Sequence, residues 1–450
     1  MSRAHTTGLY WFTRDLRLDD MPALCELNEQ VDRLILIYCK QPRWFSANPF
    51  GLTSMGKHRW SFIEQGLADL HQQLERLQQT LQVYEDEPET IIPLLCKQYA
   101  VSHIGTSRCA GVYEQRTLTT LQQRLSHCRW FIGTTMTMFH KADLPVPLDN
   151  MKDSFTPWRK SIEAHLCPAL PKDSITCLKP PPLKLPTKEM SAKEMSKIDS
   201  GAIANTYAPR HFLPTLQLRY TPNKRPHWYG GERAGLKQLH HYFYTTHNIA
   251  RYKETRNGLV GWDYSTKFSA WLAQGMLSPR RVAQCLNEYE AQYTKNSSTY
   301  WLYFELLWRE FFYWQLQKHG ALFFAAGGFK TTQGYGVFNA KRFDNWCRGQ
   351  TGCLIVDAAM RELAHTGFTS NRARQLCASY LIHELNLPWR YGAAWFEQQL
   401  IDHDVASNWG NWLYLAGKGN DPRKQRKFDM QQQTQTYDPD HRFIDLWVSP

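Results

Sequence analysis

The sequence predicts an α/β domain with a doubly wound, Rossmann-like parallel sheet, joined by a long loop to an all-α domain. The first observation is length, because 450 residues exceed what one hydrophobic core usually supports. The second is that the first part of the chain alternates short β-prone runs with longer helical patterns. The third is that helical periodicity dominates after about residue 226. We therefore expect an α/β domain over residues 1–135, a linker over 136–225 and a helical domain over 226–450.

Five short apolar runs in the first part have the length and composition of parallel strands. They cover residues 8–12, 34–39, 81–84, 102–106 and 129–133. Between the second and third runs, residues 58–79 repeat apolar side chains at a spacing of three to four, at Phe62, Leu67, Leu70, Leu74 and Leu77. This spacing predicts an amphipathic helix packed on the sheet.

Composition marks the predicted linker. Residues 168–226 hold 10 of the 23 prolines together with many lysines, as in PPPLKLP at 180–186. Such a segment favours a long surface connection. Beyond it, helical patterns cover residues 300–318, 356–365 and 371–385, so the second domain is predicted to be mostly helical.

The charge balance favours a polyanionic partner. The net charge is +12, and counterion release rewards a basic protein that binds phosphates, whatever the base sequence. Tryptophan is unusually frequent, and 12 of the 17 lie after residue 226. The second half of the chain therefore uses indoles more than is usual.

Neither a membrane span nor a disulfide framework is predicted. No apolar run reaches the roughly 18 residues that a span needs, and the first residues lack a signal-peptide pattern. The eleven cysteines are scattered, odd in number and without a Cys-x-x-Cys pair. We expect a cytoplasmic monomer with reduced thiols and no bound metal.

One phosphate-binding motif can be set aside. GLTSMGK at 51–57 has the spacing of a P-loop, but His58 follows where Ser or Thr should bind magnesium, and no buried strand precedes it. We interpret it as a loop that opens the next helix. Because no HExxH or GxGxxG motif occurs, hydrolytic and nicotinamide chemistry have no support in the sequence.

Polar and charged residues gather in the C-terminal third. LIDHDVASNWGNW at 400–412 holds Asp402, Asp404 and Asn408, and SNRARQ at 370–375 holds Asn371 and Arg374. In an apolar setting these groups suit a large cofactor with hydrogen-bonding edges and phosphates. A buried structural salt-bridge network fits the spacing equally well. The near-helical spacing of tryptophans at 301, 308 and 314 is by itself more typical of a core.

Several long blocks, in the same order, resemble the photolyase–cryptochrome family. They are GLYWFTRDLRLDDMPAL (8–24), YKETRNGLVGWDYSTKFSAWLAQGMLSPR (252–280), FELLWREFF (304–312), TGCLIVDAAMRELAHTGFTSNRARQ (351–375) and LIDHDVASNWGNWLYLAGKGNDPRK (400–424). The family fold is an α/β domain joined by a long loop to a helical domain that binds FAD. The resemblance thus implies light-driven electron transfer by FAD, with DNA as the substrate.

The resemblance also implies which residues line the FAD. Near the diphosphate and ribityl chain it places Tyr252, Ser265, Thr266, Lys267, Phe268, Ser269 and Arg309. Around the isoalloxazine and the sugar chain it places Asn371, Arg374, Asp402 and Asp404, with Asn408 near the flavin N5, and it also assigns Glu305 to the cofactor pocket. Charge near N1 and N5 is how a protein tunes a flavin.

The implied substrate site differs at two positions from that of photolyases that repair pyrimidine dimers. Trp308 and Glu305 match the tryptophan that stacks on a pyrimidine dimer and the neighbouring carboxylate, and Asn371 belongs to the same site. Gln375 stands where Met is usual, and Tyr414 where a second pocket Trp is usual, as in the DASH branch. This branch is associated with single-stranded DNA; duplex DNA would bind more weakly, and RNA is a further candidate partner.

Electron transfer and light harvesting are implied at other positions. Trp412 and Trp389 match the first two members of the family's tryptophan chain, while the third position is Gly336, with Tyr335 beside it as a substitute. Glu114 of GVYEQR resembles the residue that holds a 5,10-methenyltetrahydrofolate antenna, although no basic partner can be placed.

The leading hypothesis is a DASH-type, FAD-dependent photolyase that repairs cyclobutane pyrimidine dimers under blue or near-ultraviolet light. The alternative is a blue-light photoreceptor that binds nucleic acid without efficient repair. A third hypothesis is a nucleic-acid-binding protein in which the flavin has no photochemical role.

Overall fold

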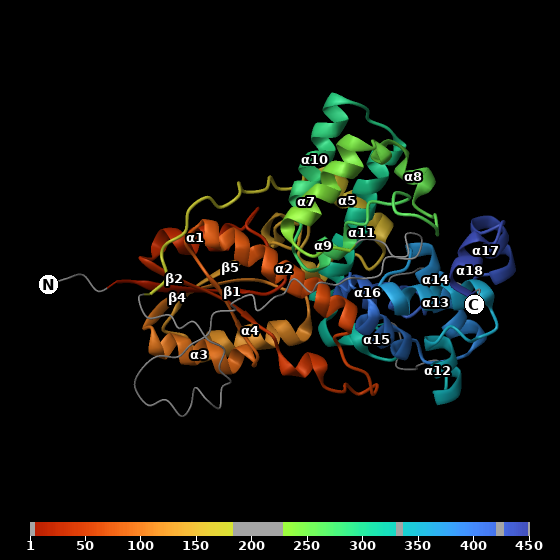
Figure 1. Ribbon diagram of the computed structural model, residues 1–450, viewed down its shortest axis with the longest axis horizontal. Helices are drawn as coiled ribbons and strands as arrows, with labels where there is room; N and C mark the ends of the chain where they lie inside the picture. The colour runs from red at the N-terminus through yellow and green to blue at the C-terminus, as the bar shows by residue number, and fades with distance from the viewer. Residues whose placement is uncertain (1–4, 183–227, 330–335, 420–426, 449–450) are drawn as a thin grey trace.

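The computed structural model describes residues 5–182, 228–329, 336–419 and 427–448. Strands and their covering helices form one side of the molecule, and a large group of helices forms the other (Figure 1). This agrees with the predicted α/β and all-α parts. The boundaries assigned at residues 135 and 225 stay a prediction.

The sheet is parallel throughout, with strand order β3-β2-β1-β4-β5. The strands are β1 (Thr7–Phe12), β2 (Arg33–Cys39), β3 (Leu81–Tyr84), β4 (Val101–Ser107) and β5 (Arg129–Gly133). All five predicted strands are confirmed, each within one residue at either end. The chain reverses direction across the sheet between β3 and β4, so β1 and β4 are neighbours at the topological switch point.

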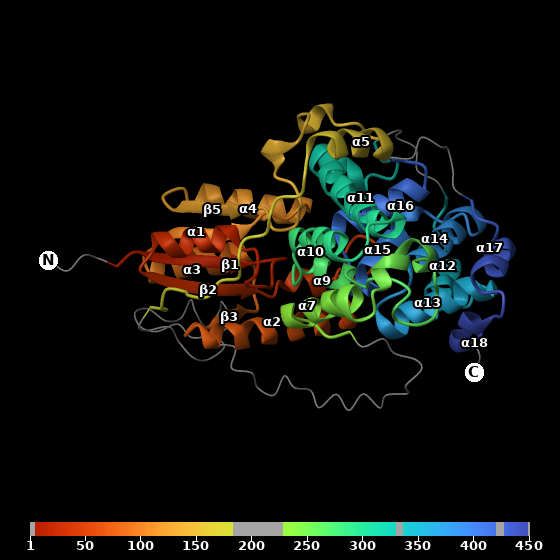
Figure 2. The same cartoon turned by 90° about the horizontal axis from the view of Figure 1, so that it is seen from above.

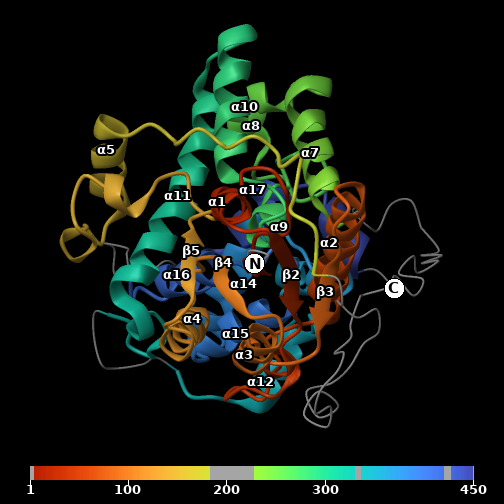
Figure 3. The ribbon, with the colours of Figure 1, turned by 90° about the vertical axis from the view of Figure 1, so that its left-hand side faces the viewer.

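Helices cover both faces of this sheet, as Figures 1 and 3 show. α1 (Pro22–Gln30) and α2 (Lys57–Arg76) lie on one face, and α3 (Pro88–Gln98) and α4 (Val112–Arg124) lie on the other. Alternate strand residues supply the two layers, since Tyr10 and Phe12 belong to the core under α1 and α2, whereas Leu9 and Trp11 belong to the core under α3. The helix predicted over 58–79 is α2.

The segment after β5 is partly ordered. It contains two 3₁₀ turns, η2 (Lys141–Asp143) and η3 (Leu148–Asn150), and the helix α5 (Phe155–His165), which packs against α11 (Ser297–His319). Residues 166–182 have no regular secondary structure and run back along the α/β domain (Figure 2). The surface connection predicted over 168–226 lies mostly outside the described residues.

The second half is helical, as predicted. Its elements are α7 (Glu232–His240), η4 (His241–Thr245), η5 (Asn248–Arg251), α8 (Tyr252–Thr255), α9 (Ser269–Ala273), α10 (Pro279–Gln292), α11, η6 (Gly320–Phe324), α12 (Ala340–Cys347), α13 (Leu354–Thr366), α14 (Asn371–Ser379), η7 (Tyr380–Glu384), α15 (Trp389–Gln399), α16 (Val405–Leu415), α17 (Met430–Tyr437) and α18 (Arg442–Val448). The helices predicted over 300–318 and 356–365 are α11 and α13. The one predicted over 371–385 is α14 continued by the π-helical turn η7.

Buried ion pairs join the two halves. Arg280 at the start of α10 reaches Asp20 in the loop after β1, with 3.1 Å between Nη1 and Oδ1, and both side chains are almost fully buried. Arg17 of the same loop donates to the backbone oxygen of Gly275 over 2.9 Å. The loop after β1 is therefore held rigidly against the helical half.

Two further features concern membrane-spanning helices and disulfide bonds. None of the helices within the described ranges is both long and apolar enough to cross a membrane. All eleven cysteines lie in the described ranges, and none forms a disulfide.

Candidate functional site

Asp402 lies at the centre of a polar cluster in the helical half. Ser269 Oγ, at the start of α9, donates to Asp402 Oδ2 over 2.6 Å, and Arg374 Nη2 of α14 donates to the same oxygen over 2.8 Å. Among the described residues, the buried Oδ1 of Asp402 has no hydrogen-bond partner. The cluster joins three segments that are distant in sequence and leaves one acceptor for a bound molecule.

The loop that precedes α9 carries hydroxyls and a buried cation. Lys267 has a φ of +59°. This value lies in the left-handed region of backbone conformation, which residues other than glycine rarely adopt. Its Nζ lies 3.0 Å from Ser265 Oγ and 3.1 Å from the centre of the Tyr264 ring. Burial lowers the pKa of Lys267 well below its usual range, while Glu362 and Asp402 oppose this effect. Hydroxyls beside a lysine suit a diphosphate, whose negative charge would favour the protonated form of the amine.

Two residues of this loop face the core. Thr266 is buried, and its backbone oxygen accepts from Gln238 Nε2 over 3.2 Å. The Phe268 ring packs between Tyr242 and Phe243, with ring centres 6.1 Å and 6.2 Å away. Any contact of Phe268 with a cofactor would therefore come from its backbone.

Glu305, Trp308 and Arg309 lie on one side of α11, where their spacing of three and four residues puts them together. Arg309 donates from Nη1 to the backbone oxygen of Met136 and from Nη2 to that of Leu272 over 3.4 Å. It thus ties α11 to the segment after β5 and to α9. Arg309 therefore has a structural role, and its contact with Leu272 places it beside α9, the helix that begins at Ser269.

Glu305 is held by two donors from neighbouring residues. Its Oε1 accepts from Arg256 Nη1 over 2.7 Å and from Trp301 Nε1 over 3.1 Å. Burial raises the pKa of Glu305, and Arg256 opposes that rise. Arg256 and Lys253 also lie 5.0 Å and 5.1 Å from the Trp301 ring centre. Tyr252, next to Lys253, is buried, and burial together with Glu305 raises its pKa.

The tryptophans of α11 divide into core and partly exposed residues. Trp314 is buried and donates to Glu310, which fits the core interpretation. Trp308 is only half-buried. It stacks on Phe155 of α5, with 3.7 Å between ring centres and 11° between planes, and meets Tyr414 of α16 edge to face at 5.7 Å. The structure therefore brings together Trp308 and Tyr414, as the substrate-site prediction requires.

The other predicted cofactor residues lie on α14 and α16. Asp404 caps α16, because its Oδ1 accepts from the Ser407 backbone N–H over 2.7 Å. Asn408 Nδ2 donates to the backbone oxygen of Ala393 over 3.0 Å, which fixes α16 to α15. Asn371 is exposed at the start of α14, and Gln375 is half-buried one turn later.

The predicted electron-transfer residues lie where α15 and α16 cross. Trp412 is buried against Gly392 of α15. Gly392 lies one helical turn after Trp389. A Cβ at Gly392 would lie 2.3 Å from the Trp412 ring, so the glycine allows the indole to approach α15 closely. Trp389 is buried, and its Nε1 donates to the backbone oxygen of Ala326 over 3.0 Å. Tyr335 lies outside the described residues.

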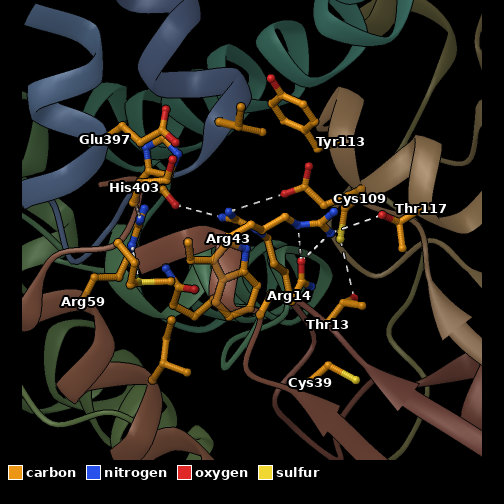
Figure 4. Close-up of a pocket in the computed structure, with 18 of the residues that line it drawn as sticks. Thr13, Arg14, Cys39, Arg43, Arg59, Cys109, Tyr113, Thr117, Glu397 and His403 are labelled. Atoms are coloured by element: carbon orange, nitrogen blue, oxygen red, sulfur yellow. Dashed lines mark hydrogen bonds and ion pairs between the residues drawn. The ribbon is translucent and has the colours of Figure 1, made fainter. Parts of the chain in front are cut away.

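A cavity of about 330 Å³ opens at the carboxyl ends of β1, β2 and β4, the position where doubly wound folds bind ligands. Figure 4 shows that the α/β half supplies most of its wall, and that Glu397 and His403 of the helical half close one side. Arg14 lies between the two halves: its Nη1 donates to the His403 backbone oxygen over 2.9 Å, and its Nη2 lies 3.8 Å from Glu114 Oε1. Arg14 is the basic partner of Glu114 that the sequence did not reveal.

Two polar atoms in the cavity wall remain unsatisfied. Within the described part of the chain, Arg59 Nη1 and His403 Nδ1 are buried and have no hydrogen-bond partner. Burial lowers the pKa of Arg59 to about 9 and that of His403 well below its usual range. Since buried polar atoms are normally paired, the Arg59 N–H is suited to an acceptor atom of a ligand, and the neutral His403 ring is suited to a donor or an acceptor.

The fold and the two sites define a class of protein with two parts. One part is a doubly wound α/β domain, and the other is a helical domain that contains the polar cluster around Asp402. A cavity lies between the two parts. Models of two protein families match: one described as the FAD-binding domain of DNA photolyase over residues 301–450, and one described as DNA photolyase over residues 8–176. The chain belongs to the photolyase–cryptochrome family.

Several similar proteins carry the name Cryptochrome DASH. A protein of Vibrio parahaemolyticus named Cryptochrome DASH is 40% identical over 445 residues, which are 98% of this chain and 93% of the relative. A solved cryptochrome from Synechocystis matches with a TM-score of 0.90 at 37% identity, covering 100% of this chain and 89% of that one. A bacterial class III photolyase from Agrobacterium tumefaciens matches with a TM-score of 0.81 at 25% identity, covering 100% and 87%.

FAD is the cofactor of this family's helical domain, and the residues present fit it. The unpaired acceptor of Asp402 suits a hydroxyl or N–H donor of the dinucleotide, and the loop with Ser265 and Lys267 suits its diphosphate. The individual assignments stay predictions.

Sequence reasoning missed three contacts that shape the sites. Arg256 pairs with Glu305, Phe155 stacks on Trp308, and Arg14 pairs with Glu114. Arg256 and Arg14 lie inside the blocks quoted for the family, so a search there for cations near predicted carboxylates could have found them. Phe155 comes from the predicted linker, and no pattern in the sequence connects it with α11.

Proposed function

We propose that the protein uses FAD and blue or near-ultraviolet light to repair cyclobutane pyrimidine dimers, mainly in single-stranded DNA. The observation that carries the proposal is the juxtaposition of Glu305 and Trp308, one helical turn apart on α11, with the Tyr414 ring 5.7 Å from Trp308. An aromatic surface beside a carboxylate is what recognition of a flipped-out base requires.

In this proposal the side chains of the site bind and orient the lesion. Trp308 and Tyr414 stack on the pyrimidine rings. Glu305 accepts from an N–H on the base edge, and Arg256 helps to keep it ionised for that task. Asn371 and Gln375, one turn apart on α14, supply amide groups. When bound, reduced FAD excited by light would supply the electron that splits the cyclobutane ring and would take it back afterwards.

The preference for single strands rests on Gln375 and Tyr414. A smaller, more polar wall stabilises a flipped base less, so the unstacking of a duplex is poorly offset. In a single strand this energy need not be supplied. The cations Lys253 and Arg256 beside Trp301 provide charge for the phosphate backbone. Duplex DNA is the weaker substrate, and RNA is a further candidate ligand.

A repair assay tests the proposal directly. Single-stranded and duplex oligonucleotides that carry one dimer are illuminated with protein whose flavin has been chemically reduced, and the remaining dimer is quantified. We expect light-dependent repair that is faster in single strands. Trp308→Ala and Glu305→Gln should abolish or strongly slow it, whereas Glu288→Gln on the exposed part of α10 serves as the matched control. Absence of light-dependent repair in single strands contradicts the proposal.

The photoreceptor alternative predicts a different pattern. A light response that survives Trp308→Ala and Glu305→Gln, but is lost in Trp389→Phe, would favour sensing over repair. The free cysteines fit a reducing compartment, and we propose that the protein acts in the cytoplasm as a monomer.

We also propose that the cavity beside Glu114 holds a 5,10-methenyltetrahydrofolate antenna. The Glu114 carboxylate can accept from the pterin ring, and the unpaired Arg59 N–H can donate to an anionic or carbonyl group. The absorption spectrum of purified protein, supplemented with the folate, measures occupancy. We expect Glu114→Gln to lower it, with the exposed Glu26→Gln of α1 as control. Equal occupancy in both variants would show that Glu114 plays no part.

A further inference from the structure

The tryptophan chain that starts at Trp412 lacks its usual outer member. Gly336 occupies that position with a φ of +77°, and a Cβ there would lie 2.5 Å from the backbone oxygen of Asn386. A side chain at this position would therefore be strained and would displace the backbone. Trp389 is 2% exposed, so it needs a redox-active neighbour to exchange electrons with the outside.

Trp409 on α16 is in ring contact with Trp389. The ring centres are 5.9 Å apart and the planes meet at 77°. Trp409 is itself 5% exposed and is packed between Phe50 and Phe324, at 6.2 Å and 5.1 Å. Its position is thus fixed by aromatic neighbours, and its separation from Trp389 is that of two indoles in contact.

The indole N–H of Trp409 has a specific acceptor. Nε1 donates to Glu397 Oε2 over 2.7 Å, and Glu397 forms part of the wall of the cavity between the two halves. An indole that has lost an electron becomes strongly acidic, and a proton acceptor within hydrogen-bond distance stabilises the oxidised state. The charged groups near Glu397 are Arg59 and Arg14, which favour its ionised form, and Glu114, which opposes it. Burial raises the pKa of Glu397, which makes the ionised carboxylate a better base.

We propose that Trp409 is the outer member of the electron-transfer chain in this protein and that Glu397 is its proton acceptor. Light-excited FAD, when bound, would accept one electron from Trp412, and the electron vacancy would then pass to Trp389 and on to Trp409. The Trp409 N–H bond breaks, its proton goes to a Glu397 oxygen, and a neutral indolyl radical remains. An external thiolate supplies one electron and becomes a thiyl radical, Glu397 returns the proton, and tryptophan is restored. The inference rests on FAD binding but not on repair of DNA.

Transient absorption of the FAD-loaded full-length protein after a blue flash tests the inference, because cationic and neutral tryptophan radicals have distinct spectra. In wild type we expect the cationic signal to be replaced by the neutral one. In Trp409→Phe the neutral signal should be lost, and steady photoreduction with a thiol should slow several-fold. In Glu397→Gln the cationic signal should persist several-fold longer. In wild type, heavy water should slow the decay of this signal, because the decay includes a proton transfer. In Glu397→Gln this isotope effect should disappear.

Two variants provide the comparison. Trp346→Phe removes another buried indole, 6.2 Å from the Trp412 ring, and should leave the neutral signal unchanged. Tyr335→Phe removes the competing residue beside Gly336. If Tyr335→Phe or Trp346→Phe abolishes the signal while Trp409→Phe retains it, the inference is overturned. An unchanged radical decay in Glu397→Gln overturns the proton step, and it decides the question even if Trp409→Phe folds poorly. Repair by chemically reduced protein is scored separately, so a failure of the proposed function does not affect this result.

Discussion

At the scale of single residues, Asp402 shows how a buried charge can serve both structure and ligand. Its Oδ2 accepts hydrogen bonds from Ser269 and Arg374, while its Oδ1 has no hydrogen-bond partner among the described residues. A buried, unpaired acceptor is costly to a protein, so its retention is explained by a bound donor. The sequence correctly placed Asp402 and Arg374 in one region. It could not show which oxygen remains available, because that depends on the approach of α9 and α14 in three dimensions.

We predict that Asp402→Asn weakens FAD binding. The amide removes the charge opposite Arg374, and a charge-assisted hydrogen bond of about 2 kcal/mol corresponds to about 30-fold in affinity. The FAD content of purified protein and the dissociation constant from fluorescence titration of stripped protein give the measurement. Asp440→Asn, at an exposed position, should behave like wild type. An Asp402→Asn protein with full FAD affinity would show that the cluster is only structural.

At the scale of elements, α11 carries much of the candidate site, and its start is defined by a capping box. Asn296 Oδ1 accepts from the backbone N–H groups of Ser298 and Thr299, over 2.8 Å and 3.1 Å, and Thr299 Oγ1 accepts from the Asn296 backbone N–H. Elements of this kind were predictable: the five strands, α2, α11 and α13 all follow from apolar periodicity. The ordered α5 was not predicted, because its proline-flanked segment resembles a linker and its contact with Trp308 is made across the fold.

We predict that Asn296→Ala lowers the free energy of unfolding by about 1 kcal/mol, the usual cost of losing an N-cap. Urea denaturation followed by circular dichroism measures it. Asn296→Asp keeps a capping oxygen but loses the 3.0 Å hydrogen bond from Nδ2 to the Ala250 backbone oxygen, so its loss should be smaller. Equal losses in the two variants would assign the effect to the Ala250 contact and not to the cap.

At the scale of the whole molecule, the two halves are joined by polar groups that neither half would bury alone. Asp20 meets Arg280, and Glu310 of α11 accepts from the Met138 backbone N–H over 2.7 Å and from Trp314 Nε1 over 3.2 Å. Burial raises the pKa of Glu310 to about 7. The two-part architecture was predictable from length and periodicity. The pairing across the boundary was not, because it links residues more than one hundred positions apart.

Glu310 predicts a pH dependence of stability. Because its pKa in the folded protein is raised, its contribution to stability is present at low pH and is lost as the pH rises through about 7. A rise from 4.5 to about 7 corresponds to at most about 3 kcal/mol. We expect the unfolding free energy of wild type to fall between about pH 5 and about pH 8. Glu310→Gln should reduce the fall, and part should remain because burial also raises the pKa of Glu362 to about 7. A Glu310→Gln protein with the same slope as wild type would contradict this assignment.

The short segment before α16 belongs to both sites. Asp402 lies at the centre of the polar cluster with Ser269 and Arg374, whereas the next residue, His403, and Val405 at the start of α16 line the cavity beside Glu114. A substitution that reshapes one wall therefore moves the other, since adjacent peptide units cannot shift independently. For protein engineering, this means that a dye introduced into the cavity is best accommodated by redesigning the strand ends of β1, β2 and β4. Exchange of residues 402–405 would alter the Asp402 cluster and the cavity at once.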